Sequence, residues 1–231
     1  MRADYHVHTA FSDDSDYPME QVVRDAIALR LEELCFTDHV DYGIKTDWDE
    51  PEAMRYRKGG PGEPDEIPLA NVDYPAYYET FQKMRSLYGD RIALKLGLEF
   101  GMQRHTVLKY EDLFARYPFD FILLSVHEID DKEFWNQDLQ KGKTQKDYNR
   151  QYYEELLYLV QCYHHYSVLG HMDLITRYDL SGVYPFKRLR PILTEILKTV
   201  IADGKGIEVN TSCHRYGLAD LTPSRDILGL Y

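Results

Sequence analysis

The order of local patterns along the chain constrains the fold more than any other feature. Short runs rich in β-branched and aromatic residues alternate with longer runs of helical periodicity. The expected strands span residues 3–8, 34–38, 93–99, 119–126, 166–171 and 206–210. The expected helices span residues 19–30, 76–88, 108–116, 146–164 and 189–203, with Pro223 at the first position of a last helix. Such alternation is typical of consecutive βα units, so we predict an α/β fold with a parallel sheet.

The length of 231 residues suits one domain, which we expect to span residues 1–231. One stretch, residues 42–71, fits neither a strand nor a helix because it is rich in Gly, Pro, Asp and Glu. Long loops within compact domains are usually functional or disordered. Because this stretch directly follows the second expected strand, we predict a lid or insertion over the active site, with a disordered surface insertion as the alternative.

Composition excludes several classes of function. The formal net charge of −12 argues against binding to nucleic acid, which depends on Lys and Arg. The sequence contains no apolar run of about 18 residues that would span a membrane, and its first residues lack the pattern of a secretory signal. We therefore expect a cytoplasmic location. Three irregularly spaced cysteines predict reduced, packed thiols and no disulfide framework.

Residues of the kind that bind metals occur at the end of one expected strand after another. His6 and His8 are two positions apart in the first strand, so their imidazoles project to the same face and can hold one ion. Such a pair alone fits simple packing equally well. Four further strand ends carry the same kinds of residue, however, and they are Asp38–His39, Glu99, His127 and His171. Because the carboxyl ends of parallel strands meet at one mouth, the pattern predicts a metal centre there.

The motifs at these strand ends resemble those of the PHP (polymerase and histidinol phosphatase) superfamily. They are HVHT at 6–9, FSDDS at 11–15, FTDH at 36–39, GLE at 97–99, SVH at 125–127 and GHMD at 170–173, in the family's order. The stretches GHMDLITRY, IEVNTS and TPS resemble the histidinol-phosphatase branch. The resemblance implies a distorted (β/α)7 TIM-like barrel that binds up to three divalent ions and a small phosphorylated substrate. Mixed imidazole and carboxylate ligands favour Zn, Mn or Fe over Mg or Ca.

The resemblance also implies roles for individual residues. His6 and His8 hold the first metal, and Glu99 bridges the first metal to the second. His127 and His171 complete the second site. Glu99, His127 and His171 are thereby the expected catalytic residues.

The third metal is implied to bind His39 and one acid of the FSDDS loop. Asp14 stands at the matching position, six residues beyond His8. Asp13 and Asp16 remain alternatives, because several carboxylates crowd this loop and spacing alone does not choose between them.

Arg177 and Arg215 are the candidate phosphate-binding residues. Each follows shortly after the end of an expected strand, and a guanidinium can donate two hydrogen bonds to phosphate oxygens. An exposed arginine is equally often a solvated charge or part of a surface ion pair. The other histidines, His105, His164 and His165, are expected on helices away from the strand ends.

The sequence departs from the family pattern near its end. The family supplies an Asp and a His from a D-x-H motif on a seventh strand, and no such motif precedes Tyr231 here. We therefore expect a barrel without its last strand, fewer bound metals and possible association at the open seam. His214, the only late histidine, stands in a different motif.

The function implied by the resemblance is metal-dependent hydrolysis of L-histidinol phosphate to L-histidinol and phosphate, in histidine biosynthesis. One alternative is another PHP phosphoesterase, acting on phosphotyrosine or on nucleotide ends. The other is a truncated, non-catalytic metal-binding form.

Overall fold

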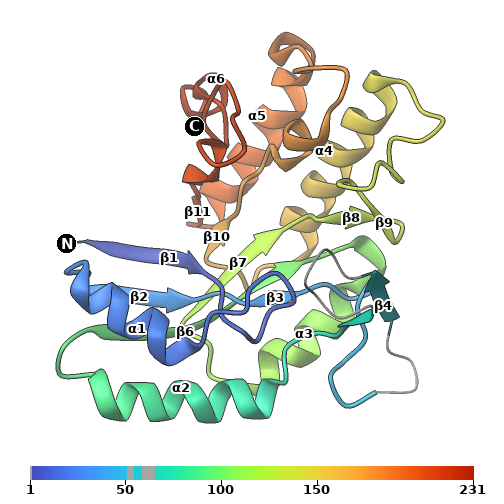
Figure 1. Ribbon diagram of the computed structural model, residues 1–231. Helices are drawn as coiled ribbons and strands as arrows, with labels where there is room; N and C mark the ends of the chain where they lie inside the picture. Colours follow the sequence, from blue (N-terminus) through green and yellow to red (C-terminus); the bar gives the residue numbers. More distant parts are fainter. Residues whose placement is uncertain (1, 51–54, 59–65) are drawn as a thin grey trace. The chain divides into compact units, whose positions relative to one another are not determined.

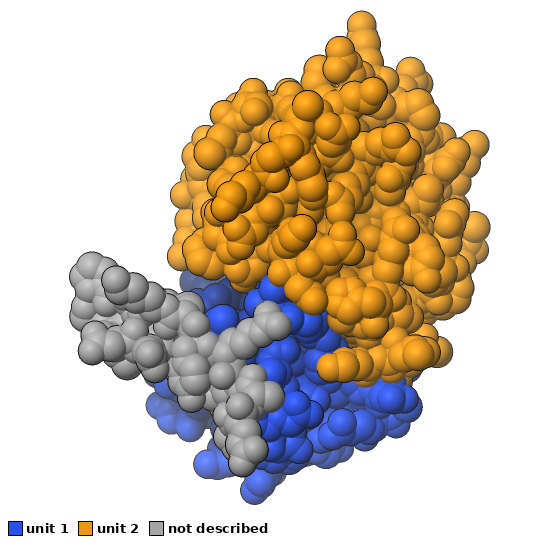
Figure 2. Space-filling model, turned by 90° about the vertical axis from the view of Figure 1, so that its right-hand side faces the viewer, with its two compact units in different colours: residues 1–100, 112–123 blue, residues 101–111, 124–231 orange. Residues whose placement is uncertain are grey.

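The computed structural model describes residues 2–50, 55–58 and 66–231. It contains two compact units (Figure 2). Unit 1 comprises Met1–Phe100 and Asp112–Leu123, and unit 2 comprises Gly101–Glu111 and Leu124–Tyr231.

Unit 1 is built on parallel strands. The strands are β1 (Ala3–Val7), β2 (Glu33–Phe36), β3 (His39–Val40) and β6 (Ala93–Gly101), followed in the sheet by the first residues of β7 (Phe121–Ser125). β1 pairs with β2, β2 pairs with the first half of β6, and β3 pairs with its second half. A separate antiparallel hairpin consists of β4 (Arg55–Lys58) and β5 (Glu66–Leu69).

Two helices of unit 1, α1 (Met19–Ala28) and α2 (Tyr74–Tyr88), lie along one side of β1, β2 and β6 (Figure 1). Both are amphipathic, and the side chains that they bury follow helical spacing. In α2 the buried side chains are Tyr74, Tyr77, Phe81 and Met84. Asp73 caps the start of α2, because its carboxylate accepts a hydrogen bond from the Ala76 amide at 3.0 Å.

Unit 2 contains the second half of the chain. Its strands are the end of β7, then β8 (Glu128–Ile129), β9 (Lys132–Glu133), β10 (Val168–Leu169) and β11 (Gly206–Ile207). Its helices are η2 (Arg104–Thr106), the start of α3 (Val107–Arg116), α4 (Gln145–Cys162), η3 (Leu174–Tyr178), α5 (Phe186–Ala202), η4 (Thr211–Cys213) and α6 (Arg225–Leu228). β7, β10 and β11 are neighbours, and β10 pairs with β11 in parallel.

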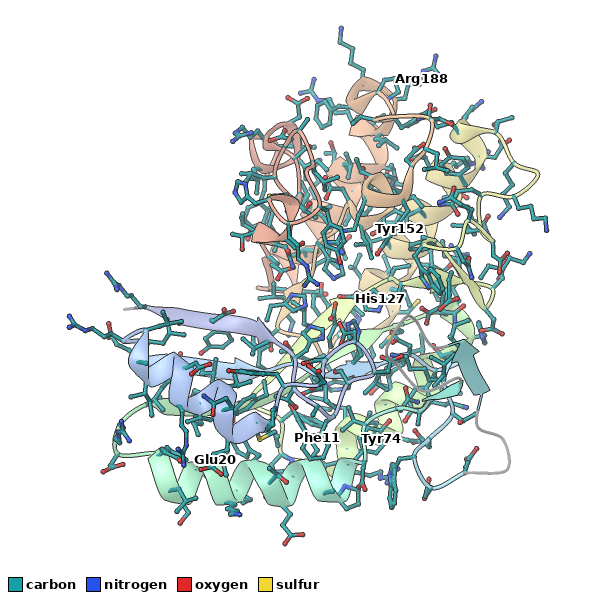
Figure 3. All side chains as sticks on the ribbon, viewed as in Figure 1. Phe11, Glu20, Tyr74, His127, Tyr152 and Arg188 are labelled. Carbon is teal, nitrogen blue, oxygen red and sulfur yellow. The ribbon has the colours of Figure 1, made fainter. Side chains whose placement is uncertain are left out.

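The core of unit 2 lies around α4 and α5, which run side by side (Figure 1). α4 buries a row of tyrosines and aliphatic residues, and Tyr152 projects from it into the interior (Figure 3). Tyr152 and Tyr153 are at most 1% exposed. Burial of such large apolar surfaces is the main favourable contribution to the stability of this unit.

The predicted α/β class with parallel strands is confirmed. Several predicted boundaries are wrong. α6 begins at Arg225 after the N-cap residue Ser224, so Pro223 lies outside it. His164 and His165 follow the end of α4, and Cys162 is exposed rather than packed. His105 belongs to η2, just beyond the end of β6, where it pairs with Asp131 at 3.0 Å.

The stretch predicted as a lid, residues 42–71, contains the β4–β5 hairpin in its described part. Residues 51–54 and 59–65 of that stretch lie outside the described residues. Between β11 and Tyr231 the structure describes every residue, and it contains η4 and α6 there but no further strand. No helix in the described part of the chain is long and apolar enough to cross a membrane.

Candidate metal centre

The register of the sheet in unit 1 brings the ends of β1 and β2 to the level of Leu96 in β6. Val7 of β1 lies opposite Phe36 of β2, which lies opposite Leu96 of β6. The Thr37 amide donates a hydrogen bond to the Val7 carbonyl at 2.8 Å, so β1 and β2 end together. The residues that follow on each strand therefore meet at the same edge.

β6 is longer than its neighbours and extends past this level, where β3 pairs with it. This pairing sets His39 directly opposite Glu99. Gly97 permits the close packing of β6 between its neighbours. A Cβ at position 97 would lie 2.8 Å from the Phe36 carbonyl oxygen and 2.7 Å from that of Phe121, closer than such atoms can approach. In the GLE motif, position 97 therefore requires glycine for steric reasons, and position 99 supplies the carboxylate that lies opposite His39.

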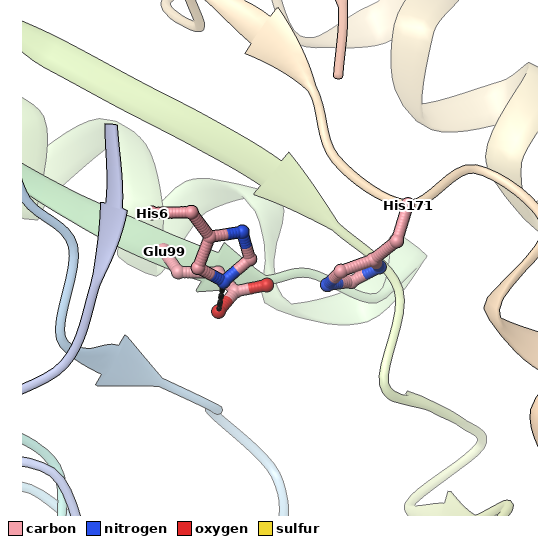
Figure 4. A group of neighbouring side chains, drawn as sticks. All are labelled: His6, Glu99 and His171. Carbon is pink, nitrogen blue, oxygen red and sulfur yellow. Dashed lines mark hydrogen bonds and ion pairs between the residues drawn. The ribbon is translucent and has the colours of Figure 1, made fainter. Parts of the chain in front are cut away.

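The carboxylate of Glu99 is the centre of a histidine cluster. Glu99 is fully buried, and Figure 4 shows it beside His6. Its Oε2 atom lies 3.1 Å from His6 Nε2, 3.4 Å from His8 Nε2 and 3.5 Å from His39 Nδ1. The His6 and His8 rings are stacked at 5.0 Å between centroids, as expected for side chains two apart on one strand.

A second carboxylate, that of Asp14, faces the same cluster from the loop after β1. Its oxygens lie 3.2 Å from His8 Nδ1 and 3.3 Å from His39 Nε2. Burial alone would raise the pKa of Asp14, but the hydrogen bonds to His39 and His8 outweigh it and hold that pKa well below its usual range. Asp14 is thus an anion in contact with two imidazoles.

The neighbouring acid, Asp13, has a different partner. Lys45 Nζ lies 2.6 Å from Asp13 and 2.7 Å from Asp41, and its side chain is 8% exposed. Burial lowers the pKa of the Lys45 ammonium, but the carboxylates of Asp41 and Asp13 outweigh this and raise it. Asp13 is therefore held in an ion pair.

The chemistry and spacing of this cluster fit a divalent transition-metal ion. Ligand atoms of His8, His39 and Glu99 all lie within 4.8 Å of one another. Two atoms bound to one zinc at about 2.1 Å in tetrahedral geometry are about 3.4 Å apart, and the His8–Glu99 and His39–Glu99 distances of 3.4 and 3.5 Å match this value. The donor atoms around Glu99 are therefore close enough together to share a divalent ion.

Two predicted ligands, His127 and His171, lie in unit 2. Their ring centroids are 5.4 Å apart. His171 stands on the segment after β10 (Figure 4), and its backbone amide donates a hydrogen bond to Glu208 Oε2 at 2.8 Å. Their predicted contribution to a second metal stays a prediction.

The two candidate phosphate-binding arginines lie near one aromatic ring of unit 2. Arg177 donates a hydrogen bond to Ser212 Oγ at 2.7 Å, and its guanidinium carbon lies 4.1 Å from the Tyr216 ring centroid. Arg215 is exposed, with its guanidinium carbon 5.9 Å from the same centroid. Stacking and one hydrogen bond thus fix Arg177, whereas Arg215 is more loosely held.

Comparison with known proteins places this arrangement in a family. The sequence model of the PHP domain matches residues 4–212. The chain belongs to the PHP domain family. It is 32% identical to the histidinol-phosphatase of Lactococcus lactis over 216 residues, which cover 91% of this chain and 71% of that protein.

Two solved structures have a similar fold. A crystal structure of histidinol phosphate phosphatase from Lactococcus lactis, complexed with zinc, L-histidinol and phosphate, is 30% identical, with a TM-score of 0.74. The match covers 91% of this chain and 73% of that one. A second crystal structure, from Listeria monocytogenes, has a TM-score of 0.71 at 17% identity and supports the fold alone.

Sequence reasoning assigned no role to three acids near these PHP motifs. Asp38 precedes His39 and is fully buried, Asp173 follows His171 and is 5% exposed, and Glu208 contacts the His171 backbone. Burial raises the pKa of the Asp38 carboxyl even though it accepts several hydrogen bonds. The sequence does contain a signal for Asp38 and Asp173, because they lie one and two positions from the predicted ligands His39 and His171.

The buried acid Asp173 predicts a pH dependence of stability in this PHP chain. Burial raises the pKa of Asp173 to about 7, although the Ser224 amide donates a hydrogen bond to its carboxylate at 2.8 Å. The folded chain therefore keeps a proton that the unfolded chain loses near pH 4. This contribution to stability is complete below about pH 4 and is lost as the pH rises through about 7.

Asp173→Asn should remove this dependence, because an amide does not ionise. Between pH 5 and pH 8, wild type should lose on the order of 2 to 3 kcal/mol of unfolding free energy relative to the variant, at about 1.36 kcal/mol per pKa unit. Urea denaturation with chelator present, repeated across this pH range, measures the difference. Parallel stability curves for the two proteins would contradict the prediction.

Proposed function

We propose that this PHP chain is a metal-dependent phosphomonoesterase that hydrolyses L-histidinol phosphate to L-histidinol and phosphate in histidine biosynthesis. The observation that carries the proposal is the convergence of three imidazoles, those of His6, His8 and His39, on Glu99 Oε2 at 3.1 to 3.5 Å. The likeness to a relative whose structure holds zinc, L-histidinol and phosphate supports the choice of substrate. A cytoplasmic location is part of the proposal.

In this proposal the cluster of unit 1 holds the metal. His6, His8 and Glu99 bind one ion, and His39 with Asp14 binds another. Glu99 Oε2 contacts the imidazoles of His6 and His8, which supports its place in the first site. The bridge from Glu99 to a second metal, held by His127 and His171, is also part of the proposal. When bound, divalent ions polarise the phosphoryl group and acidify water, so that a nucleophile exists at neutral pH. The buried Glu99 supplies negative charge that favours two cations close together.

Arg177 is proposed to hold the phosphoryl group of the substrate. Ser212 and Tyr216 fix the guanidinium. A guanidinium held in one position is well suited to phosphate oxygens and loses little entropy on binding them. Arg215 is proposed as a second, more mobile contact.

Among the three acids of the loop after β1, we propose Asp14 as the ligand. Asp14→Asn should weaken zinc binding by about 10-fold to 100-fold, as loss of a carboxylate near a metal does. Asp13→Asn should have a smaller effect because Asp13 pairs with Lys45, and Asp16→Asn should have the smallest effect. Competition with a chromogenic zinc chelator ranks the three variants, and a larger effect at Asp13 or Asp16 would contradict the assignment.

Comparison of substrates tests the proposed function. The purified chain, loaded with zinc, should release phosphate from L-histidinol phosphate with a higher kcat/KM than from phosphotyrosine or an aryl phosphate. Zinc content is measured on the same sample. Preference for phosphotyrosine would indicate another phosphoesterase activity, and bound zinc without turnover of any substrate would indicate a metal-binding protein.

A further inference from the structure

The fully buried carboxylate of Asp38 accepts hydrogen bonds from two residues of the loop after β1. Asp38 Oδ1 accepts from the Thr9 amide at 2.6 Å and from Ser12 Oγ at 2.9 Å. Thr9 Oγ1 lies 3.1 Å from each oxygen of the carboxylate. Ser12 Oγ in turn accepts a hydrogen bond from the His39 amide at 2.8 Å, which closes a ring back to the residue after Asp38. We call Asp38, Thr9 and Ser12 the loop clamp.

Each member of the loop clamp adjoins a residue that faces the candidate metal centre. Thr9 directly follows His8, Ser12 stands two positions before Asp14, and Asp38 directly precedes His39. His8 and His39 both contact Asp14 and Glu99. The backbone positions of His8, Asp14 and His39 therefore depend on the hydrogen bonds of one carboxylate, that of Asp38.

The energetics make this dependence strong. A buried carboxylate is very costly unless it is hydrogen-bonded, and loss of its partners restores that cost. The loop after β1 contributes three donors to Asp38, which are the Thr9 amide and the hydroxyls of Thr9 and Ser12. Any other conformation of the loop would take these three donors from the Asp38 carboxylate and leave it with Tyr77 of α2, which also hydrogen-bonds Asp38.

We propose that Asp38 is a positioning residue, which holds His8, Asp14 and His39 in ligating geometry through the loop clamp. The inference rests on the proposed metal centre. It assigns Asp38 no contact with substrate or metal, and its effect passes through Thr9, Ser12 and the two flanking histidines.

Two substitutions at position 38 separate positioning from other roles. Asp38→Ala removes every acceptor of the loop clamp. Asp38→Asn loses the negative charge but keeps a carbonyl oxygen, which can accept from the Thr9 amide and Ser12 Oγ where Oδ1 does now. Positioning predicts that zinc affinity falls about 10-fold to 100-fold in Asp38→Ala and is largely rescued in Asp38→Asn.

A matched control exists at Asp179 in unit 2. Asp179 is 9% exposed, and its carboxylate accepts hydrogen bonds from Tyr148 Oη, Asn149 Nδ2, Gln145 Nε2 and the Ser181 amide at 2.6 to 3.1 Å. None of these donors adjoins a candidate ligand of unit 1. Asp179→Ala should therefore lower the melting temperature of the metal-free chain as Asp38→Ala does, yet leave zinc affinity unchanged.

The experiment measures zinc affinity of the full chain by competition with a chromogenic chelator, alongside melting temperatures without metal. Ser12→Ala, a milder break in the loop clamp, carries the same test if Asp38→Ala does not fold, and it should also weaken zinc binding. If wild type binds zinc and either Asp38→Ala or Ser12→Ala binds it equally well, the positioning role of Asp38 is overturned and the proposed metal centre still stands. Zinc affinity as low in Asp38→Asn as in Asp38→Ala would also overturn the positioning role. The negative charge of Asp38, and not its hydrogen bonds to the loop, would then be what zinc binding requires. Absence of zinc binding by wild type would overturn the proposed metal centre itself.

Discussion

Replacing Glu99 by Gln is expected to lower kcat/KM for L-histidinol phosphate by about 100-fold or more. Even residues that only support metal ligands are typically worth about 10-fold to 100-fold, and Glu99 contacts three imidazoles at once. Glutamine keeps the size of the side chain but removes the negative charge. The measurement is steady-state phosphate release at saturating zinc, with zinc content determined on the same protein.

His164→Ala is the control for this experiment. His164 follows the end of α4, its side chain is 56% exposed, and it pairs with Asp203 at 2.8 Å. Exposed pairs of this kind contribute little, about 0 to 1 kcal/mol, so activity should stay close to wild type. Similar losses in Glu99→Gln and His164→Ala would contradict the role assigned to Glu99.

Removal of metal is expected to have the second large effect. A strong chelator followed by dialysis should reduce phosphatase activity by on the order of 1,000-fold, because metal ions contribute several kcal/mol to such reactions and about 1.4 kcal/mol is tenfold. Added zinc should restore the activity. The melting temperature should fall and recover in parallel, since a ligand that binds only the folded chain stabilises it.

The residues of unit 1 explain why restoration should be complete. His8, His39 and Glu99 are positioned by strand register and by hydrogen bonds that need no metal. The metal-free chain should therefore stay folded and bind zinc again. Full activity in the chelated, metal-free chain would contradict a metal-dependent mechanism.

The strand-end pattern was predictable because parallel strands obey simple geometry. His6 and His8 share a face, β1 and β2 end at one level, and β6 continues past that level to place Glu99 opposite His39. The sequence alone therefore predicts that His6, His8, His39 and Glu99 lie close together. The helices of unit 1 were predictable for a similar reason, since their buried residues follow a regular period.

The choice among the loop acids was not predictable, because it depends on contacts distant in sequence. Asp13 turns to Lys45, whereas Asp14 faces His8 and His39. The role of Asp38 was missed for the same reason, since its partners Thr9 and Ser12 lie almost 30 positions earlier in the chain. Local spacing carries no information on such partners.

Short elements were the least predictable part of the fold. β10 and β11 comprise two residues each, much shorter than the runs 166–171 and 206–210 expected from composition. Their pairing is limited to Val168 with Gly206 and Leu169 with Ile207. Propensity describes which residues favour a strand, but the extent of pairing is decided by tertiary contacts.

Diffraction at the zinc absorption edge, from crystals of the zinc-loaded chain, tests the central claim most directly. We expect an anomalous peak at Glu99, with at least one imidazole nitrogen of His8 or His39 about 2.0 to 2.1 Å from it. A carboxylate oxygen of Glu99 should also lie within ligand distance. Zinc bound only elsewhere, with the Glu99 cluster free of anomalous density at saturating zinc, would contradict the proposed metal centre.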